Sequence, residues 1–258
     1  LLMDYKKLFN QAEDHYALGQ YNEALTLFKR AYEIEPSNDC LNYIGCSYLK
    51  LEEYDSAIKC FEDLIIKCPD WERPIFNLGR VYHKIGNDGK ALEYLNRAKV
   101  INPNNEDVYY YLGVYYESIK DYEVAIKYYR HSLEINDDQP ETHLNLGVCY
   151  MKQNLYEEAL SEFGRTLNYD AACEDAIYNQ GLVYKLMGNY KFALEKFKML
   201  HKLDPQNIEY LMSIETCYSK LSDWENALIW NNRILEIQPD NEKTIRVSKR
   251  LDELIKNN

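Results

Sequence analysis

The histidines and cysteines of this chain are the first residues to consider for chemistry, because their side chains bind metals and act as nucleophiles. The histidines stand at positions 15, 83, 131, 143 and 201, and the cysteines at 40, 46, 60, 68, 149, 173 and 217. No His-Glu-x-x-His or Cys-x-x-Cys spacing occurs among them. An odd set of scattered cysteines favours free thiols in a reducing compartment over disulfides. We expect no metal site.

The remaining chemical signals also argue against catalysis. The glycines form no phosphate-binding loop, and the many carboxylates have the scatter typical of solvated helix surfaces. We therefore expect no catalytic residues and no cofactor, and a chain that is not an enzyme.

Bulk properties limit the partners. The chain has 258 residues and a net charge of −12, and its lysines form no basic tract. Nucleic acid and anionic membranes are therefore not expected as partners. No apolar run approaches the ~18–20 residues of a membrane span, and no signal peptide opens the chain, which predicts a cytoplasmic location. The first residue is Leu1 rather than methionine, so we expect a segment of a longer protein.

One period of 34 residues, with a single step of 33, organises the chain. An alanine marks each of seven copies, and a small residue precedes it by twelve positions in six of them. The alanines are Ala24, Ala57, Ala91, Ala125, Ala159, Ala193 and Ala227; the small residues are Ala12, Gly45, Gly79, Gly113, Gly147 and Gly181. Tyrosine stands nine positions before the alanine in six copies, and Phe, Leu or Tyr stands four positions after it in six copies.

Each repeated residue type has a packing reason. A glycine inside a helix costs about 1 kcal/mol relative to alanine, so its recurrence indicates a close approach of two backbones. Aromatic side chains would fill the space that the small residues leave. Turn-forming residues fall where the first helix of each pair must end, at Gly19, Gly86, Asn154 and Gly188. The period therefore predicts pairs of antiparallel helices.

Proline stands twelve positions after the alanine in five copies, at Pro36, Pro69, Pro103, Pro205 and Pro239. This order of small residue, tyrosine, alanine, aromatic residue and proline resembles the tetratricopeptide repeat (TPR). The resemblance implies seven helix-turn-helix repeats, at residues 5–37, 38–71, 72–105, 106–139, 140–173, 174–207 and 208–241. We expect an all-α fold, a right-handed TPR α-solenoid over residues 1–241. Residues 242–258 are expected to form a capping helix and tail, with the apolar face Ile245, Leu251, Leu254 and Ile255 turned inward.

By the same resemblance, the first helices of the repeats line a concave groove that binds partners. The groove positions hold cations and asparagines in repeats 1–3, and aromatic, acidic and amide side chains in repeats 4–6. The predicted partner-binding residues are Lys6, Asn10, Arg73, Asn77, Arg80, Lys84, Tyr110, Tyr111, Glu117, Asn145, Tyr178 and Asn179.

The sequence supports some of these candidate binding residues more strongly than others. Acids recur in the first turns of the predicted helices, where the helix dipole alone favours them. Lys6 and Arg73 stand at the same position against that preference, so a cation there needs another reason. Tyr110, Tyr111 and Tyr178 lie outside the repeated framework positions, and exposed aromatic side chains are good anchors for a partner.

The leading hypothesis is a protein–protein interaction scaffold or adaptor that holds other proteins or peptides within a larger complex. Residues 173–182 and 194–203 resemble a repeat of the TPR subunits of intraflagellar transport, which implies a ciliary assembly and the cilium as a location.

Two alternatives stay open. The first is a co-chaperone-like module for acidic C-terminal peptides: Lys6 and Asn10 match such a clamp and Arg73 is an acceptable cation, whereas Tyr43 and Asn77 depart from it. Its binding would weaken strongly with salt. The second is a regulatory TPR segment of a larger enzyme.

Overall fold

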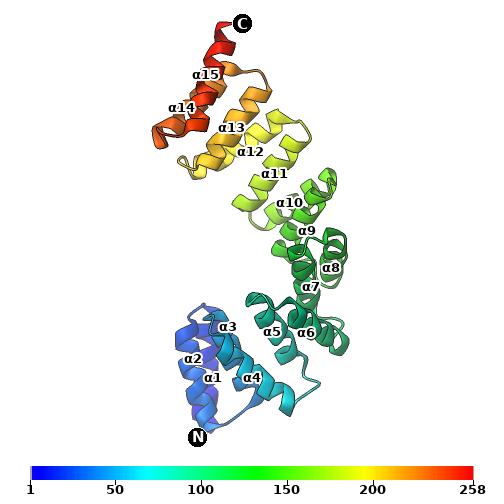
Figure 1. Ribbon diagram of the computed structural model, residues 1–258. Coiled ribbons are helices and arrows are strands. Elements are labelled where there is room, and N and C mark those ends of the chain that lie inside the picture. The colour runs from blue at the N-terminus through cyan, green and yellow to red at the C-terminus, as the bar shows by residue number, and fades with distance from the viewer. Residues whose placement is uncertain (1, 258) are drawn as a thin grey trace. The chain divides into compact units, whose positions relative to one another are not determined.

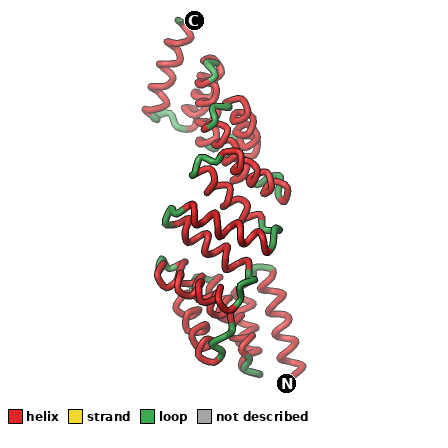
Figure 2. Tube along the Cα trace, turned by 90° about the vertical axis from the view of Figure 1, so that its right-hand side faces the viewer, coloured by secondary structure: helices red, strands yellow, loops and turns green. Residues whose placement is uncertain are grey.

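The computed structural model describes residues 2–257, and every regular element in this range is an α-helix (Figure 1). The described residues form fifteen helices and no strand. Figure 2 shows these helices joined by short loops. The all-α fold predicted from the period is confirmed.

The chain divides into two compact units, Leu1–Asp137 and Asp138–Asn258. Unit 1 contains α1 (Leu2–Ala17), α2 (Tyr21–Ile34), α3 (Asn38–Lys50), α4 (Tyr54–Lys67), α5 (Glu72–Lys84), α6 (Asp88–Ile101), α7 (Glu106–Ser118) and α8 (Tyr122–Ile135). Unit 2 contains α9 (Pro140–Lys152), α10 (Tyr156–Tyr169), α11 (Glu174–Leu186), α12 (Tyr190–Leu203), α13 (Ile208–Lys220), α14 (Trp224–Ile237) and α15 (Glu242–Lys256).

A left-handed residue reverses the chain inside each of the seven helical hairpins. Its φ lies between 59° and 77° and it stands at equivalent places, at Gly19, Glu52, Gly86, Lys120, Asn154, Gly188 and Ser222. The sequence indicated four of these turns through glycine or asparagine. Glu52, Lys120 and Ser222 adopt the same conformation without the residue types that favour it.

The small residues and the aromatic rings meet as predicted. A Cβ atom added to Gly113 would lie 2.5 Å from the ring of Tyr129, and one added to Gly147 would lie 2.6 Å from the ring of Phe163. Both rings are fully buried. Each glycine therefore allows the second helix of its hairpin to place an aromatic side chain directly on the first helix.

Successive hairpins are tied together by the acids at the starts of the first helices. Asn105 Nδ2, at the start of α7, donates to Glu72 Oε1 of α5 at 2.8 Å. Asn136 Nδ2 donates to Glu106 Oε1 at 3.2 Å within a single hairpin, where it joins the end of α8 to the start of α7. In unit 2, the Tyr210 hydroxyl donates to Glu174 Oε2 at 3.0 Å. These acids thus have a structural role beyond the helix dipole.

Helix α15 occupies the expected cap segment, although Asn258 lies outside the described residues. Asn231 of α14 holds it, because its Nδ2 donates to the Thr244 carbonyl at 3.1 Å and to Ser248 Oγ at 2.6 Å. Leu251 of α15 is buried. Asn231 stands where other copies have an aromatic residue or leucine, and binding α15 explains that departure.

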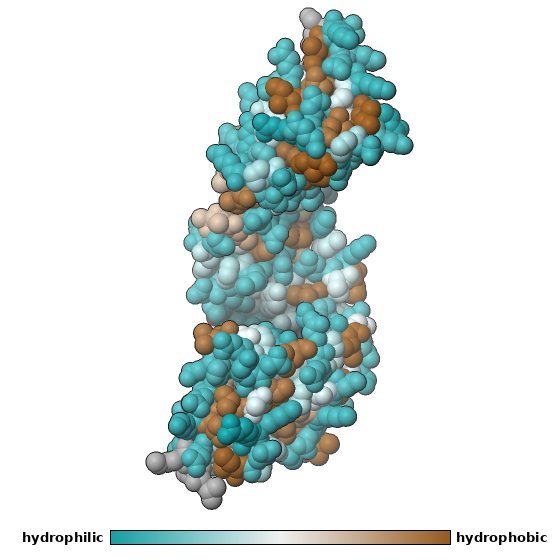
Figure 3. All heavy atoms as spheres, turned by 90° about the vertical axis from the view of Figure 1, so that its left-hand side faces the viewer, coloured by the Kyte–Doolittle hydropathy of each residue, from teal (hydrophilic) through white to brown (hydrophobic). Residues whose placement is uncertain are grey.

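On the face shown in Figure 3, hydrophobic side chains form separate brown patches among teal atoms.

Candidate functional site

A polar hollow lies in unit 1 between α5 and the start of α7. Its volume is about 460 Å³. We call it the Arg80 hollow; its lining residues are Glu72, Arg73, Phe76, Asn77, Arg80, Asn102, Asn104, Asn105, Glu106 and Asp107. Three of the predicted partner-binding residues, Arg73, Asn77 and Arg80, therefore share one site.

Arg80 is the centre of this hollow. Its guanidinium lies over two rings, 5.0 Å from the centroid of Tyr111 and 5.5 Å from that of Phe76. One of its terminal nitrogens donates to Asn77 Oδ1 at 3.1 Å. Its Nε is buried and has no hydrogen-bond partner among the described residues. The side chain is thus held by aromatic faces and one amide, with donor capacity left over.

Tyr111 joins the cationic and aromatic parts of the predicted groove, which the sequence had placed in different repeats. Its ring packs edge-on against Phe76 at 5.5 Å and against Tyr110 at 5.2 Å. Tyr110 in turn lies 6.0 Å from the ring of Tyr129. The result is a continuous aromatic wall beside Arg80.

The hollow carries both signs of charge. Glu72, Glu106 and Asp107 face the same space as Arg73 and Arg80. Burial raises the pKa of the Glu72 carboxyl, while the hydrogen bond from Asn105 and the charge of Arg73 oppose that rise. Two arginines beside three acids and several asparagine amides suit a polar chain of mixed charge better than a polyanion.

A second set of residues, on α3, adjoins this hollow and was not among the predicted binding residues. The Asn42 side chain is 6% exposed, and its Oδ1 lacks a hydrogen-bond partner among the described residues. Burial raises the pKa of the Cys46 thiol to about 11 and that of Tyr43 to about 12. Cys46 is therefore a protonated thiol at neutral pH, and it accepts a hydrogen bond from Asn77 Nδ2 at 3.3 Å.

The other predicted residues of unit 1 lie outside the hollow. Lys6 and Asn10 on α1 and Lys84 at the end of α5 are exposed. Glu117 accepts a hydrogen bond from the Tyr129 hydroxyl at 2.6 Å, so its carboxylate supports the α7–α8 hairpin.

Unit 2 carries the remaining predicted residues, all half-buried on first helices. Asn145 lies on α9 and Asn179 on α11. The Tyr178 hydroxyl donates to Glu209 Oε1 at 2.5 Å, and its ring packs 5.7 Å from that of Phe197. The Tyr178 hydroxyl is thus already engaged within unit 2.

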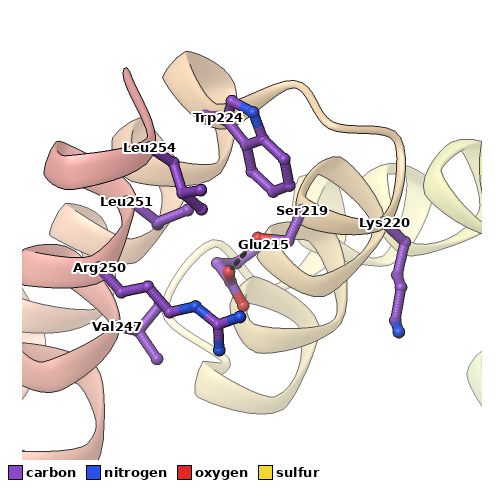
Figure 4. Close-up of a pocket in the computed structure, with 8 residues that line it drawn as sticks. All are labelled: Glu215, Ser219, Lys220, Trp224, Val247, Arg250, Leu251 and Leu254. Atoms are coloured by element: carbon purple, nitrogen blue, oxygen red, sulfur yellow. Dashed lines mark hydrogen bonds between the residues drawn. The ribbon is translucent and has the colours of Figure 1, made fainter. Parts of the chain in front are cut away.

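A second hollow, of about 390 Å³, lies between α13, α14 and α15 (Figure 4). Trp224 and Leu254 close its apolar side, and Arg250 extends toward Glu215 on the opposite side. Ser219 Oγ donates to Glu215 Oε1 at 2.7 Å. Glu215 stands where the other copies have a small residue.

No group of three or more His, Cys, Asp or Glu side chains in residues 2–257 is placed to hold a metal ion. His143 is buried and its Nδ1 lies 2.6 Å from Glu162 Oε2, so this histidine has an internal partner. In the same range, no helix is both long enough and apolar enough to cross a membrane.

Three protein-family models match parts of the chain. The model described as anaphase-promoting complex, cyclosome, subunit 3 matches residues 2–64. Two models described as tetratricopeptide repeat match residues 43–106 and 120–179. A curated relative, anaphase-promoting complex subunit 6 of Arabidopsis thaliana, is 28% identical over 95 residues, which are 34% of this chain and 18% of the relative. The chain thus matches less than a fifth of that relative's length.

Solved structures share the fold. The APC/C hetero-tetramer Cut9-Hcn1 has a TM-score of 0.70 at 16% identity, covering 93% of this chain and 48% of that one. Pseudomonas aeruginosa pilF has a TM-score of 0.70 at 18% identity, with coverages of 81% and 95%. A tetratricopeptide repeat protein from Parabacteroides merdae has a TM-score of 0.61 at 16% identity, with coverages of 96% and 99%. At these identities the likeness concerns the fold alone.

Proposed function

We propose that this chain, whose tetratricopeptide repeats form an all-α solenoid suited to protein interaction, is a non-enzymatic scaffold that holds segments of partner proteins within a multiprotein assembly. The single observation that carries the proposal is the Arg80 hollow. It offers a cation held on aromatic faces, amide groups and carboxylates, and these are groups that recognise a polypeptide backbone and its polar side chains.

The geometry favours this scaffold over a clamp for acidic C-terminal peptides. Glu72, Glu106 and Asp107 would repel a cluster of carboxylates at the positions where Arg73 and Arg80 would attract one. Tyr43, which stands where a clamp needs asparagine, stacks on Phe28 at 4.9 Å and serves packing.

The assembly we propose is of the kind formed by the anaphase-promoting complex, since one family model and one curated relative bear that name. None of the relatives described above is a ciliary transport subunit, so the ciliary resemblance gains no support. The cytoplasmic location, the absence of nucleic-acid partners and the regulatory segment of an enzyme stay predictions.

The test is affinity capture with charge reversal inside and outside the hollow. Arg80→Glu and Tyr111→Ala should each remove a defined set of co-purifying subunits, because a buried interface anchor contributes about 2 kcal/mol or more. The matched control is Lys59→Glu, which reverses an exposed cation on α4 of the same unit. Circular dichroism of each variant checks that the helices remain.

The outcomes separate the hypotheses. Subunits that survive a high-salt wash with wild type and Lys59→Glu, but are lost with Arg80→Glu, support the scaffold. Binding of a synthetic acidic C-terminal peptide that disappears at high salt would favour the clamp instead. Retention of every partner by Arg80→Glu and Tyr111→Ala contradicts a role for this hollow.

A further inference from the structure

Helix α12 departs from the other second helices on its solvent-facing side. Phe192, Met199 and Leu203 are 55%, 45% and 55% exposed, and we call them the α12 stripe. In the other six copies, the place of Phe192 is taken by Glu23, Ser56, Lys90, Val124, Glu158 and Asn226. The place of Met199 is taken by Arg30, Asp63, Arg97, His131, Arg165 and Arg233. The repeat framework therefore does not require large apolar side chains at either place. Leu203 is not such a departure, because five of the other six copies also have a large apolar or aromatic residue at its place: Ile34, Ile101, Ile135, Tyr169 and Ile237.

The charges of α12 are also unlike those of its counterparts. The helix contains four lysines and one glutamate, in a chain whose net charge is −12. Every other second helix, from α2 to α14, has an acid in its first turn, and α12 has none. Lys191 stands there instead, although the helix dipole disfavours a cation at that end.

Only one of these lysines has an internal partner. Lys198 donates to the Tyr218 hydroxyl at 2.7 Å, which ties α12 to α13. The side chains of Lys191, Lys196 and Lys202 make no hydrogen bond or ion pair with the described part of the chain. These three cations flank the α12 stripe and are free to pair with a partner.

Helix α14 adds a fourth cation beside the end of α12. The Arg233 guanidinium lies 4.3 Å from the Trp230 ring centroid and 3.5 Å from His201 Nε2 on α12. Burial and the charge of Arg233 lower the pKa of His201, so this imidazole is neutral at pH 7 and leaves the charge to Arg233. Two helices of unit 2 thus contribute to one basic, partly apolar surface.

We propose that the α12 stripe, with Lys191, Lys196, Lys202 and Arg233 around it, is a second docking surface that binds an acidic amphipathic helix of a partner protein. The stripe spans residues 192–203, whose ends lie about 16 Å apart along the helix axis, and this length matches three turns of an opposing helix. Apolar side chains of the partner would cover Phe192, Met199 and Leu203, and its flanking glutamates would pair with the lysines. This surface is separate from the Arg80 hollow, which lies in unit 1.

The test uses a defined probe and the full chain. The probe is a fluorescein-labelled helical peptide with leucines spaced to form one apolar face and glutamates on both flanks. Its control carries lysine at every glutamate position. We expect fluorescence anisotropy to show binding of the acidic peptide, at least tenfold weaker binding of the basic one, and weakening by salt.

Variants assign the binding to the stripe. The double variant Phe192→Ser with Met199→Ser, and the double variant Lys196→Glu with Lys202→Glu, should each weaken binding at least tenfold. The matched control is Ile66→Ser with Val100→Ser, which removes apolar side chains that are 81% and 80% exposed on α4 and α6. That control and Arg80→Glu should leave the affinity for the acidic peptide unchanged. A negative result for the α12 stripe can therefore be distinguished from a negative result for the Arg80 hollow.

Several results overturn the proposal. The first is absence of binding up to about 1 mM peptide, a concentration high enough to detect weak specific binding. The second is equal binding of the acidic and basic peptides. The third is unchanged affinity in both double variants. Self-association of the chain that Phe192→Ser abolishes would instead assign the stripe to a second copy. Binding to phosphatidylserine vesicles that the same variant abolishes would assign it to a membrane.

Discussion

At the scale of single residues, the glycines of the first helices are required by the side chains that pack on them, which are aromatic rings except for Leu95 against Gly79. The pair of Gly113 and Tyr129 is the tightest, because a Cβ atom would lie 2.5 Å from the ring. The Tyr129 hydroxyl donates to Glu117, which prevents the ring from moving away. The first hairpin shows the alternative solution, since Ala12 stands at that place and faces Phe28, whose ring has no hydroxyl anchor.

Replacing Gly113 by alanine should therefore destabilise the chain. We expect a loss of about 1–3 kcal/mol from overpacking, which outweighs the gain in helix propensity. The control is Gly164→Ala on α10, where a Cβ atom meets nothing within 4 Å. That change should stabilise by about 0.5–1 kcal/mol. Urea unfolding of both variants checks the opposite signs, and an equal effect at the two sites would show that the ring contact does not matter.

At the scale of elements, the turn between paired helices is one structure made from different sequences. Gly86 and Lys120 have φ of 73° and 63° at equivalent places, although only glycine adopts this region without cost. The exposed Lys120 side chain makes no described contact that would offset the strain of its positive φ.

Lys120→Gly should consequently stabilise the α7–α8 hairpin by about 0.5–1 kcal/mol, after the entropy cost of glycine is subtracted. Gly86→Ala should destabilise the α5–α6 hairpin by about 1–2 kcal/mol, even though its Cβ atom would meet empty space. Thermal unfolding of the two variants measures both effects. Changes of the same sign would mean that backbone conformation is not what limits these turns.

The elements also show which structural features the sequence predicts and which it does not. Helix positions and the pairing of small with aromatic residues follow from local periodicity, which the 34-residue pattern displays directly. The hydrogen bond from the Tyr129 hydroxyl to Glu117 depends on side-chain geometry across a hairpin, which the position of Glu117 in its repeat does not reveal. The contact of Arg80 with Tyr111 joins two repeats and has no periodic signal. The α12 stripe becomes visible only when exposure is compared between equivalent helices.

At the scale of the whole molecule, stability should be local rather than shared by all residues. The buried clusters are built from neighbouring helices: Leu41, Phe61 and Leu78 share one, and Ile177, Phe197 and Leu211 share another. Repeat proteins with this organisation behave approximately as sums of repeat and nearest-neighbour terms. The chain also divides into two compact units with separate buried clusters, so we expect each unit to unfold largely on its own.

Matched glycine substitutions in the two units test this locality. Gly113→Ala strains a ring contact in unit 1, and Gly147→Ala strains the equivalent contact with Phe163 in unit 2. If opening is local, hydrogen exchange should accelerate mainly in residues 4–137 for the first variant and in residues 138–257 for the second. A uniform acceleration along the chain in both variants would mean that the units unfold as one. Since partner docking must order or strain the helices that it touches, local opening would also allow the Arg80 hollow and the α12 stripe to bind their partners independently.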